Sequence, residues 1–378
     1  MKLAYDAKRI TNNYTGLGNY SRFVVNNMAE QYPEDKLLLF SPDKAKPAMM
    51  ELISKSNNME FMLPRKNLNN IRKAIWRSRG MTNDILHAKP DLYHGLTNEL
   101  PFSIKSIGVP TIVTIHDLIF LHYPQFYKFI DRKIYNYKFR RACEDSAHIV
   151  AVSECTKRDI INFYKIAPKK VSVIYQGCNS LFMQKSSTDQ KAEVKKKFHL
   201  PSEFILSVGT IEERKNLLLT VRALKASKLD IKLVVIGRRK KYAKQVDTFI
   251  EQNRMQGQVL FLKDVEFEEL PTIYQLSSLF VYPSLYEGFG IPIIEALHSE
   301  VPTIGASGSC LEEAGGEGAV YINPHNHGEL AEKMKWILSN KQQAQNMIDK
   351  GLEHVQNFDH EKVTKEMREL YLQTCYHK

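Results

Sequence analysis

The sequence predicts an α/β protein made of two doubly wound, Rossmann-like domains. Short apolar, β-branched segments alternate with segments of helical periodicity along the 378 residues. This alternation is typical of parallel sheets that are covered by helices on both faces. The length suits two or three domains, and about six strands are expected in each half.

In the first half, the strand candidates are short apolar segments that end in polar or turn residues. They are Lys2–Asp6, Lys36–Ser41, Asp91–Gly95, Thr111–Ile115, His148–Val152 and Val171–Tyr175. Helical periodicity is seen over Asn19–Glu30, Gln125–Arg141 and Cys155–Phe163. Ser153 suits the N-cap of the last helix, because its hydroxyl can accept from a free backbone amide.

The second half repeats the pattern after a polar break near Gln176–Ser187. Its strand candidates are Phe204–Val208, Lys232–Ile236, Val259–Lys263, Leu279–Tyr282, Thr303–Gly305 and Ala319–Ile322. Its helical stretches include Asn216–Ala226, Phe267–Leu276 and Pro292–His298, and a final helix is expected over Glu361–Tyr371. We place the domain boundary between residues 178 and 179. Because ligands bind beyond the carboxyl ends of parallel strands, we expect a site in the cleft between the two sheets.

Composition narrows the class of protein. Hydrophobic residues make up 43% and charged residues 25% of the chain, which is ordinary for a globular protein. No apolar stretch is long enough to span a bilayer, and the segment from Met1 is interpreted as a strand rather than a signal peptide. Five cysteines without a C-x-x-C spacing indicate reduced thiols in a cytoplasm and no zinc site. The net charge of +11 favours phosphate-bearing ligands or an anionic membrane, and nucleic acid is disfavoured because no nucleic-acid motif accompanies it.

The segment from Glu287 to Glu295 carries the most informative pair of residues. Gly288 and Gly290 permit a tight turn after a buried strand, and Pro292 suits the first turn of a helix. Glu287 is therefore expected on a loop, and Glu295 early in a helix beside free N–H groups and the positive end of the dipole. A sugar nucleotide, with hydroxyls at both ends and phosphates between, fits this layout. The alternative is a strand–turn–helix with two solvated glutamates.

Two cations follow another strand. Gly209 ends it, and Arg214 and Lys215 are expected to open the next helix. They could neutralise a diphosphate leaving group, whose charge grows as the glycosidic bond breaks. A solvated basic turn is the alternative.

Two further segments lie at strand ends in the first domain. Gly16 and Gly18 precede a helix, where backbone N–H groups can meet phosphate or sugar oxygens, although G-x-G-x-x-G is incomplete. A tight turn is the alternative. His116 ends the strand Thr111–Ile115 and is expected to point into the cleft, where it could bond a sugar hydroxyl. Alternatively, His116 and Asp117 form a structural pair that caps a turn.

The remaining candidates are weaker. Val265, after Asp264, is placed where its backbone could contact a nucleotide base, and the basic run 238–241 is interpreted as a solvated helix start. The sequence contains no D-x-D, whose paired carboxylates would hold a divalent cation on a diphosphate. We therefore expect no metal and no cofactor, with charge neutralised by Arg214 and Lys215.

Together these segments resemble the retaining GT-B glycosyltransferases of family four, over essentially the whole chain. In motif detail they are most similar to bacterial mannosyltransferases of surface-polysaccharide assembly. The resemblance rests on Gly16–Gly18, His116–Leu118, Gly209–Asn216, Glu287–Glu295 and Ser309–Gly315. The family often has Ser-Ser-Leu-Pro-Glu where this chain has Ser309-Cys310-Leu311-Glu312-Glu313, so the proline is missing.

The resemblance implies a role for each residue. Glu287 would hold the donor sugar, and Glu295 would bind the ribose diol. Arg214 and Lys215 would bind the diphosphate. His116 would contact the donor sugar and help to stabilise the transition state. The implied donor-binding set is Gly16, Gly18, Gly209, Val265, Gly288, Phe289, Gly290, Leu311 and Glu295. It also implies an acceptor-binding domain of residues 1–178, completed by the C-terminal helix 359–378, and a donor-binding domain of residues 179–358.

The implied reaction is metal-independent, retaining transfer of a hexose, with mannose from GDP-mannose favoured, to a glycan or a lipid-linked saccharide. A UDP-sugar donor, a sugar-nucleotide epimerase and a non-catalytic binding protein remain as alternatives. We expect a cytoplasmic protein that contacts the inner face of the membrane. Its contact would use the cations of residues 65–79 beside Ile75 and Trp76, and a solvated basic helix is the alternative.

Overall fold

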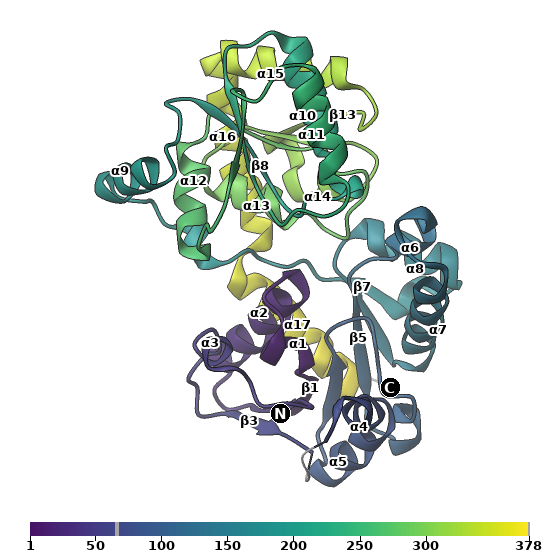
Figure 1. The fold of residues 1–378 in the computed structure, drawn as a ribbon. Coiled ribbons are helices and arrows are strands. Elements are labelled where there is room, and N and C mark those ends of the chain that lie inside the picture. The colour runs from purple at the N-terminus through teal and green to yellow at the C-terminus, as the bar shows by residue number, and fades with distance from the viewer. Residues whose placement is uncertain (65–67, 377–378) are drawn as a thin grey trace. The chain divides into compact units, whose positions relative to one another are not determined.

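The structure is a computed structural model that describes residues 1–64 and 68–376. The chain divides into two compact units. Unit 1 comprises Met1–Gly177 with Phe358–Lys378, and unit 2 comprises Cys178–Asn357. Each unit contains one parallel sheet with helices on both faces (Figure 1), which confirms the predicted fold class.

The sheet of unit 1 has seven strands in the order β3-β2-β1-β4-β5-β6-β7, and within the described residues each strand pairs in parallel with its neighbours. Their bounds are β1 Lys2–Asp6, β2 Lys36–Phe40, β3 Met59–Met62, β4 Leu92–Gly95, β5 Thr111–Ile115, β6 His148–Ala151 and β7 Val171–Val173. The sequence predicted all of these except β3. This edge strand has no buried residue, so it lacks the apolar signal that reveals its neighbours.

The helices of unit 1 differ from the prediction near Gly16 and Gly18. Gly16 and Gly18 lie in the first turn of α2, not in a loop before it, and a short helix α1 separates them from β1. The helices are α1 Lys8–Asn12, α2 Gly16–Gln31, α3 Pro47–Met50, α4 Asn70–Ile75, α5 Met81–Ala88, α6 Ile119–His122, α7 Phe129–Asp145, α8 Glu154–Tyr164 and α17 His360–Tyr376, with a π-helical turn at Trp76–Gly80. In α17, Tyr371 is fully buried and its hydroxyl lies 2.7 Å from Nδ1 of His94 on β4.

The sheet of unit 2 has six parallel strands in the order β10-β9-β8-β11-β12-β13. They are β8 Phe204–Val208, β9 Lys232–Ile236, β10 Val259–Leu262, β11 Leu279–Tyr282, β12 Thr303–Ala306 and β13 Ala319–Ile322. The helices are α9 Thr188–Lys197, α10 Leu217–Ser227, α11 Ala243–Gln252, α12 Leu270–Leu276, α13 Ile291–His298, α14 Leu311–Gly315, α15 His327–Ser339 and α16 Lys341–His354.

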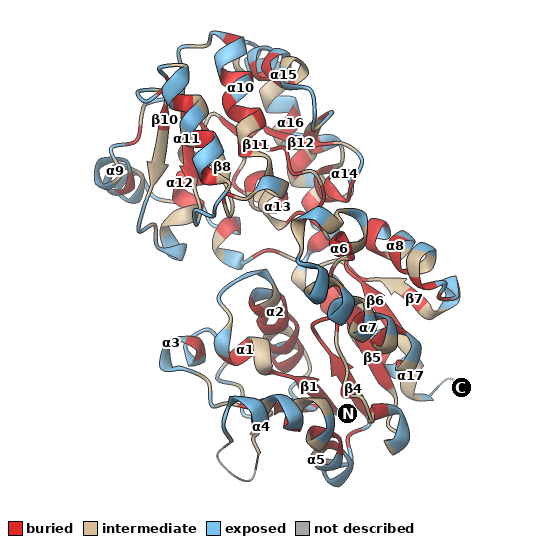
Figure 2. Ribbon diagram, turned by 45° about the vertical axis from the view of Figure 1, so that its right-hand side comes forward, coloured by how far each residue is buried: buried red, intermediate tan, exposed pale blue. Residues whose placement is uncertain are grey.

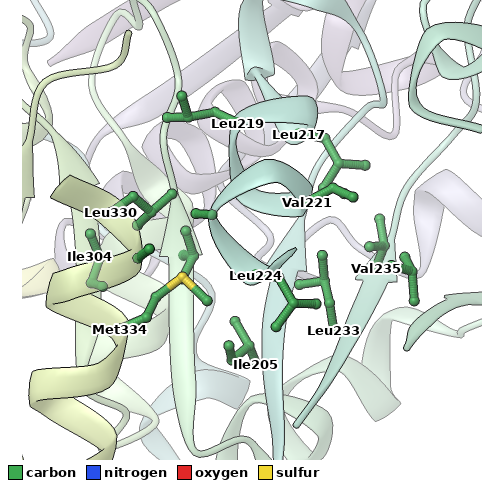
Figure 3. Close-up of a cluster of buried hydrophobic side chains, with 14 of the residues drawn as sticks. Ile205, Leu217, Leu219, Val221, Leu224, Leu233, Val235, Ile304, Leu330 and Met334 are labelled. Carbon is green, nitrogen blue, oxygen red and sulfur yellow. The ribbon is translucent and has the colours of Figure 1, made fainter. Parts of the chain in front are cut away.

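The core of unit 2 lies between its sheet and helices such as α10 and α15. Figure 3 shows Leu217, Val221 and Leu224 of α10 facing apolar side chains of the strands and of α15. The central strands are buried on both faces, whereas the helices expose their outer sides (Figure 2). This pattern explains why the strands are continuous apolar runs in the sequence.

The strand order reverses once in each sheet. In unit 1 the reversal lies between β1 and β4, and in unit 2 it lies between β8 and β11. At such a point the connections leave in opposite directions, so a crevice opens at the carboxyl edge of the sheet, where ligands bind. Each unit therefore has one favoured place for a site.

Candidate active site

The loops after β8 and β11 meet at the reversal in unit 2. Gly209 follows β8 with φ of 140°, a backbone conformation that favours glycine. A Cβ atom at Gly237, after β9, would lie 1.8 Å from the Gly209 carbonyl oxygen, so this crossing needs glycine. The backbones at Gly209 and Gly237 are thus fixed close together. The side chains of Arg214 and Lys215, after β8, point to the carboxylate of Glu287, after β11.

Glu287 is the centre of this cluster. Its Oε1 lies 2.5 Å from Nζ of Lys215, and its Oε2 lies 2.7 Å from Nη1 of Arg214. The hydroxyl groups of Ser284 and Tyr282 also donate to Oε1. The carboxylate is only 11% exposed, so these contacts are little screened by water.

The charges determine how these groups ionise. Burial alone would raise the pKa of Glu287. The positive charges of Arg214 and Lys215 outweigh burial and lower this pKa to about 2. Burial and the neighbouring Arg214 lower the pKa of Lys215, while Glu287 opposes this change. Burial also lowers the pKa of Arg214, but Glu287 raises it above its ordinary value. Glu287 is therefore a carboxylate at neutral pH and not a proton donor.

The two cations are also held by other groups. They lie in a 3-10 turn, Glu213–Lys215, before α10, and so do not open the helix as predicted. Nη1 of Arg214 donates to the Tyr286 carbonyl at 2.8 Å, and Nη2 donates to Glu212 at 3.0 Å. Glu212 is paired in turn with Lys240. Both cations are therefore pre-positioned, as electrostatic stabilisation of a developing charge requires.

Glu295 is not at the helix start where the sequence placed it. It is the fifth residue of α13, in the second turn, and it accepts a hydrogen bond from the Tyr274 hydroxyl at 3.1 Å. Burial raises its pKa to about 7, and the bond from Tyr274 opposes this rise. Glu287 and Glu295 thus titrate in very different ranges, although they lie in one motif.

The remaining motif residues form the turn into α13 and α14. Pro292 lies in the first turn of α13, as predicted. Gly290 caps α13 with φ of 125°, and a Cβ atom there would lie 2.9 Å from Cδ2 of Leu311. Phe289 and Leu311 are buried. Leu311 begins α14, and Glu312, at the position of the missing proline, accepts from the Gly308 amide at 3.0 Å. Val265 is half-buried after β10, two strands away from β8.

His116 and the glycines Gly16 and Gly18 lie in unit 1. The ring of Tyr20, on α2, meets the His116 ring edge-on with centroids 4.6 Å apart. Nε2 of His116 donates to the Leu96 carbonyl at 2.8 Å, which fixes the tautomer. Burial lowers its pKa to about 4, so the imidazole is neutral at pH 7. A Cβ atom at Gly18 would lie 2.0 Å from the Asn13 carbonyl oxygen, so this glycine is a packing requirement.

Unit 1 also holds a polar pocket of about 290 Å³ at its own strand-order reversal. Asp6, at the end of β1, accepts from Nη2 of Arg77 at 2.6 Å. Nη1 of Arg77 donates to Glu99 at 2.9 Å, and Lys138 of α7 lies 3.3 Å from Glu99. Lys8 also lines the pocket, and burial and Arg77 lower its pKa. The pocket therefore combines carboxylates and cations within reach of one small ligand.

Sequence reasoning missed several partners of the site residues. Ser284 and Tyr282 hold Glu287, and Tyr274 holds Glu295. Ser284 lies three residues before Glu287, a spacing that could have suggested a contact, but Tyr274 belongs to another helix and gave no signal. Within residues 1–64 and 68–376, no cluster of three or more His, Cys, Asp or Glu is arranged to hold a metal ion.

Two family models match the chain, one in each unit. The model of glycosyl transferases group 1 matches residues 189–354, and the model of Glycosyltransferase Family 4 matches residues 24–180. The chain belongs to the GT-B glycosyltransferases. The matched segments contain His116 in unit 1 and both glutamates with both cations in unit 2, whereas Gly16, Gly18 and Asp6 precede the matched segment of unit 1.

The relatives of this glycosyltransferase include bacterial mannosyltransferases. It is 28% identical to the O-antigen chain mannosyltransferase RfbU of Salmonella typhimurium over 65% of each chain. It is 24% identical to O-antigen chain mannosyltransferase B of Escherichia coli, over 98% of this chain and 99% of that one. It is 28% identical to the E. coli serotype-specific mannosyltransferase WbdA, but that match spans only 32% of the relative.

Solved structures share the fold at lower identity. A glycosyltransferase from Rickettsia africae aligns with a TM-score of 0.78 and 17% identity, covering 100% of this chain and 99% of that one. Anabaena Alr3699/HepE in complex with UDP and glucose aligns with a TM-score of 0.75 and 15% identity, covering 98% of this chain and 99% of that one. Both support the GT-B fold of this glycosyltransferase.

Proposed function

We propose that this glycosyltransferase moves mannose from GDP-mannose to a saccharide acceptor, with retention of anomeric configuration. The observation that carries the proposal is the cluster of Glu287, Lys215 and Arg214 at the strand-order reversal of unit 2. The mannosyltransferase relatives support the choice of hexose, and the choice of GDP comes from the family resemblance. Phosphate-binding cations and a carboxylate that accepts from hydroxyls are the groups that a sugar nucleotide needs.

Arg214 and Lys215 would hold the donor diphosphate. Two fixed cations stabilise the negative charge that grows on the leaving phosphate, at no cost of reorganisation during the reaction. Glu287 is ionised, so it would accept hydrogen bonds from the donor sugar while it keeps both cations in place. Glu295 would accept from the ribose hydroxyls, and the backbone at Gly209, Gly288 and Leu311 would approach the phosphates.

Retention would proceed without an enzymic nucleophile. An oxocarbenium-like state would be attacked by the acceptor on the face that the leaving group departs. The leaving phosphate would take the proton of the acceptor hydroxyl. Neutral His116 would accept a hydrogen bond from the donor sugar and stabilise this state. Metal-independent transfer is part of the proposal, because Arg214 and Lys215 supply the positive charge.

The main alternative is a UDP-sugar donor. It is favoured by one comparison, because Anabaena Alr3699/HepE was crystallised with UDP and glucose. An epimerase or a binding protein without activity are weaker alternatives. An epimerase would convert the donor without an acceptor, and a binding protein would have less need of two buried cations beside Glu287.

A panel of sugar nucleotides tests the donor. GDP-mannose should raise the midpoint of thermal unfolding more than UDP-glucose, GDP-glucose or UDP-N-acetylglucosamine, because a ligand of the folded state stabilises it. A larger shift with a UDP-sugar would favour the alternative donor. Glu287→Gln should reduce the shift, whereas Glu251→Gln, an exposed residue near the carboxyl end of α11, should leave it unchanged.

The acceptor would bind in unit 1. The pocket between Asp6, Arg77 and Glu99 supports this, because its carboxylates can accept from sugar hydroxyls and its cations can meet an anionic group. We also propose that the acceptor is lipid-linked and that transfer occurs at the inner face of the membrane. Glu99→Gln should raise the KM for a saccharide acceptor and leave hydrolysis of the donor by water unchanged. An unchanged acceptor KM would place the acceptor elsewhere.

A further inference from the structure

Helix α7 has an unusual outer face. Phe129 is 64% exposed, Ile130 70%, Ile134 45% and Tyr137 57%. The opposite side of the same helix buries Phe139, Ala142 and Cys143 in the core of unit 1. The exposed apolar groups are therefore not needed for packing within unit 1.

These exposed residues form one surface. Ile130, Ile134 and Tyr137 are spaced i, i+4 and i+7, so they lie in a single stripe along the helix. Phe129, in the first turn, extends the apolar surface at the amino end of the helix. We call these four residues the α7 face. Single exposed apolar residues are common, but three in one stripe with Phe129 beside its amino end are not explained by chance exposure.

Positive charge surrounds the α7 face. Between residues 128 and 141 the chain has six Lys and Arg residues and one acid, Asp131. The side chains of Arg132 and Lys133 lie over the Phe129 ring, at 5.5 and 5.4 Å from its centroid. Apolar and aromatic side chains with cations beside them are the composition of helices that lie in the interface of a bilayer.

The segment that the sequence favoured for membrane contact is less suitable than predicted. Trp76 is buried and its indole N–H donates to Asp84 at 2.7 Å. Arg77 is paired with Asp6 and Glu99 inside the pocket. Arg65 and Lys66 lie outside the described residues. Exposed Ile71 and Ile75 of α4 remain, but the buried Trp76 and the paired Arg77 do not join them at a surface.

We propose that the α7 face docks on an anionic lipid bilayer. Phe129, Ile130 and Ile134 would enter the boundary between headgroups and acyl chains, while Lys133 and Arg140 would meet lipid phosphates. A folded protein partner is less suitable, because a stable interface buries about 800 Å² on each side and one helical stripe offers much less. No helix in the described residues is long and apolar enough to cross a membrane. Reversible docking at the bilayer surface does not need a membrane-spanning helix.

The α7 face also adjoins the proposed acceptor pocket. Lys138 of α7 lines that pocket and pairs with Glu99. Arg141, also on α7, donates to the carbonyl of Phe102, another lining residue. A bilayer bound at α7 would therefore lie beside the pocket, as the lipid-linked acceptor requires. This last point rests on the proposed function, whereas docking itself does not.

Vesicle sedimentation tests the proposal with the full chain. Vesicles of phosphatidylglycerol and phosphatidylethanolamine should sediment the wild-type protein at low salt, and phosphatidylcholine vesicles should not. The triple variant Phe129→Ser, Ile130→Ser, Ile134→Ser should reduce the partition coefficient by about tenfold or more. Trp336→Ser is the matched control, because Trp336 is an exposed aromatic with Lys333 at 5.4 Å from its ring, but in unit 2. It should bind like the wild type.

A second measurement does not depend on loss of binding. Phe129→Trp should gain fluorescence that is quenched by brominated lipid in anionic vesicles, beyond the quenching of the wild type. Wild-type affinity in the triple variant, or equal partitioning of the wild type to anionic and neutral vesicles, would overturn the proposal. So would loss of binding in Ile71→Ser, Ile75→Ser with full binding in the triple variant. Donor-induced thermal shifts should be the same in every variant, so failure of docking is distinguishable from failure of the proposed chemistry.

Discussion

The carboxylate of Glu287 and the ammonium of Lys215 lie 2.5 Å apart, with 11% and 18% of the two side chains exposed. A buried ion pair is stable only when its geometry is good and further hydrogen bonds satisfy both groups. Here Arg214, Ser284 and Tyr282 supply those bonds. The cations are therefore held in position before any ligand binds.

Lys215→Ala should reduce turnover strongly and should change donor affinity less. Loss of one fixed donor to a developing negative charge typically costs about 10²- to 10³-fold in kcat. Steady-state kinetics with GDP-mannose measure this effect. Lys244→Ala is the control, because Lys244 is an exposed lysine of α11 outside the cluster around Glu287. Equal losses in both variants would show that Lys215 has no special role.

Glu287→Ala and Glu295→Ala should differ in their kinetics. Glu287 is placed on the donor sugar, near the reacting carbon, so its loss should mainly lower kcat. Glu295 is placed on the ribose, so its loss should mainly raise the donor KM, which is the sign of lost uniform binding. The same kinetic profile in both variants would contradict separate roles.

Glu295→Gln should change how stability depends on pH. The folded-state pKa of Glu295 is about 7, against an ordinary value of 4.5. Between these values the folded protein keeps a proton that the unfolded chain has lost, so this residue lowers stability as pH rises from 4.5 to 7. The glutamine variant should be more stable than the wild type at pH 8 by about 1–2 kcal/mol. Denaturant unfolding at pH 4 and pH 8 measures the difference, which should nearly vanish at pH 4.

Transfer should survive excess chelator. Arg214 and Lys215 are expected to neutralise the donor diphosphate, so a divalent cation is not required for this step. Activity should be the same with EDTA and with added Mg²⁺ or Mn²⁺. Complete loss of activity that returns when metal is added would contradict this prediction.

Much of the fold was predictable because buried parallel strands leave a continuous apolar signal. All six strands of unit 2 were predicted, but in unit 1 the edge strand Met59–Met62 was missed, since it has no buried residue. Trp76 was expected at a membrane surface because its neighbours are basic, yet a hydrogen bond to Asp84 holds it in the protein. Charge in the sequence does not show which cations are already paired.

The candidate site was predictable to the level of its loops. Residues after β8 and β11 were expected near one another, and the contacts of Glu287 with Arg214 and Lys215 confirm that they are. The difference in pKa between Glu287 and Glu295 was not predictable, because the pKa of Glu295 depends on Tyr274 and on burial that only the folded chain defines. The roles of these residues in transfer stay predictions.

The central claim is retaining transfer of mannose from GDP-mannose, and the anomeric configuration of the product tests it most directly. The full-length protein would be incubated with GDP-mannose and a synthetic lipid-linked saccharide acceptor, and the new linkage would be followed by NMR as it forms. We predict an α-mannosyl product, which matches the α-linked donor, and no product from the Lys215→Ala variant over the same time. A β-linked product would contradict retention, and transfer only from a UDP-sugar would contradict the proposed donor.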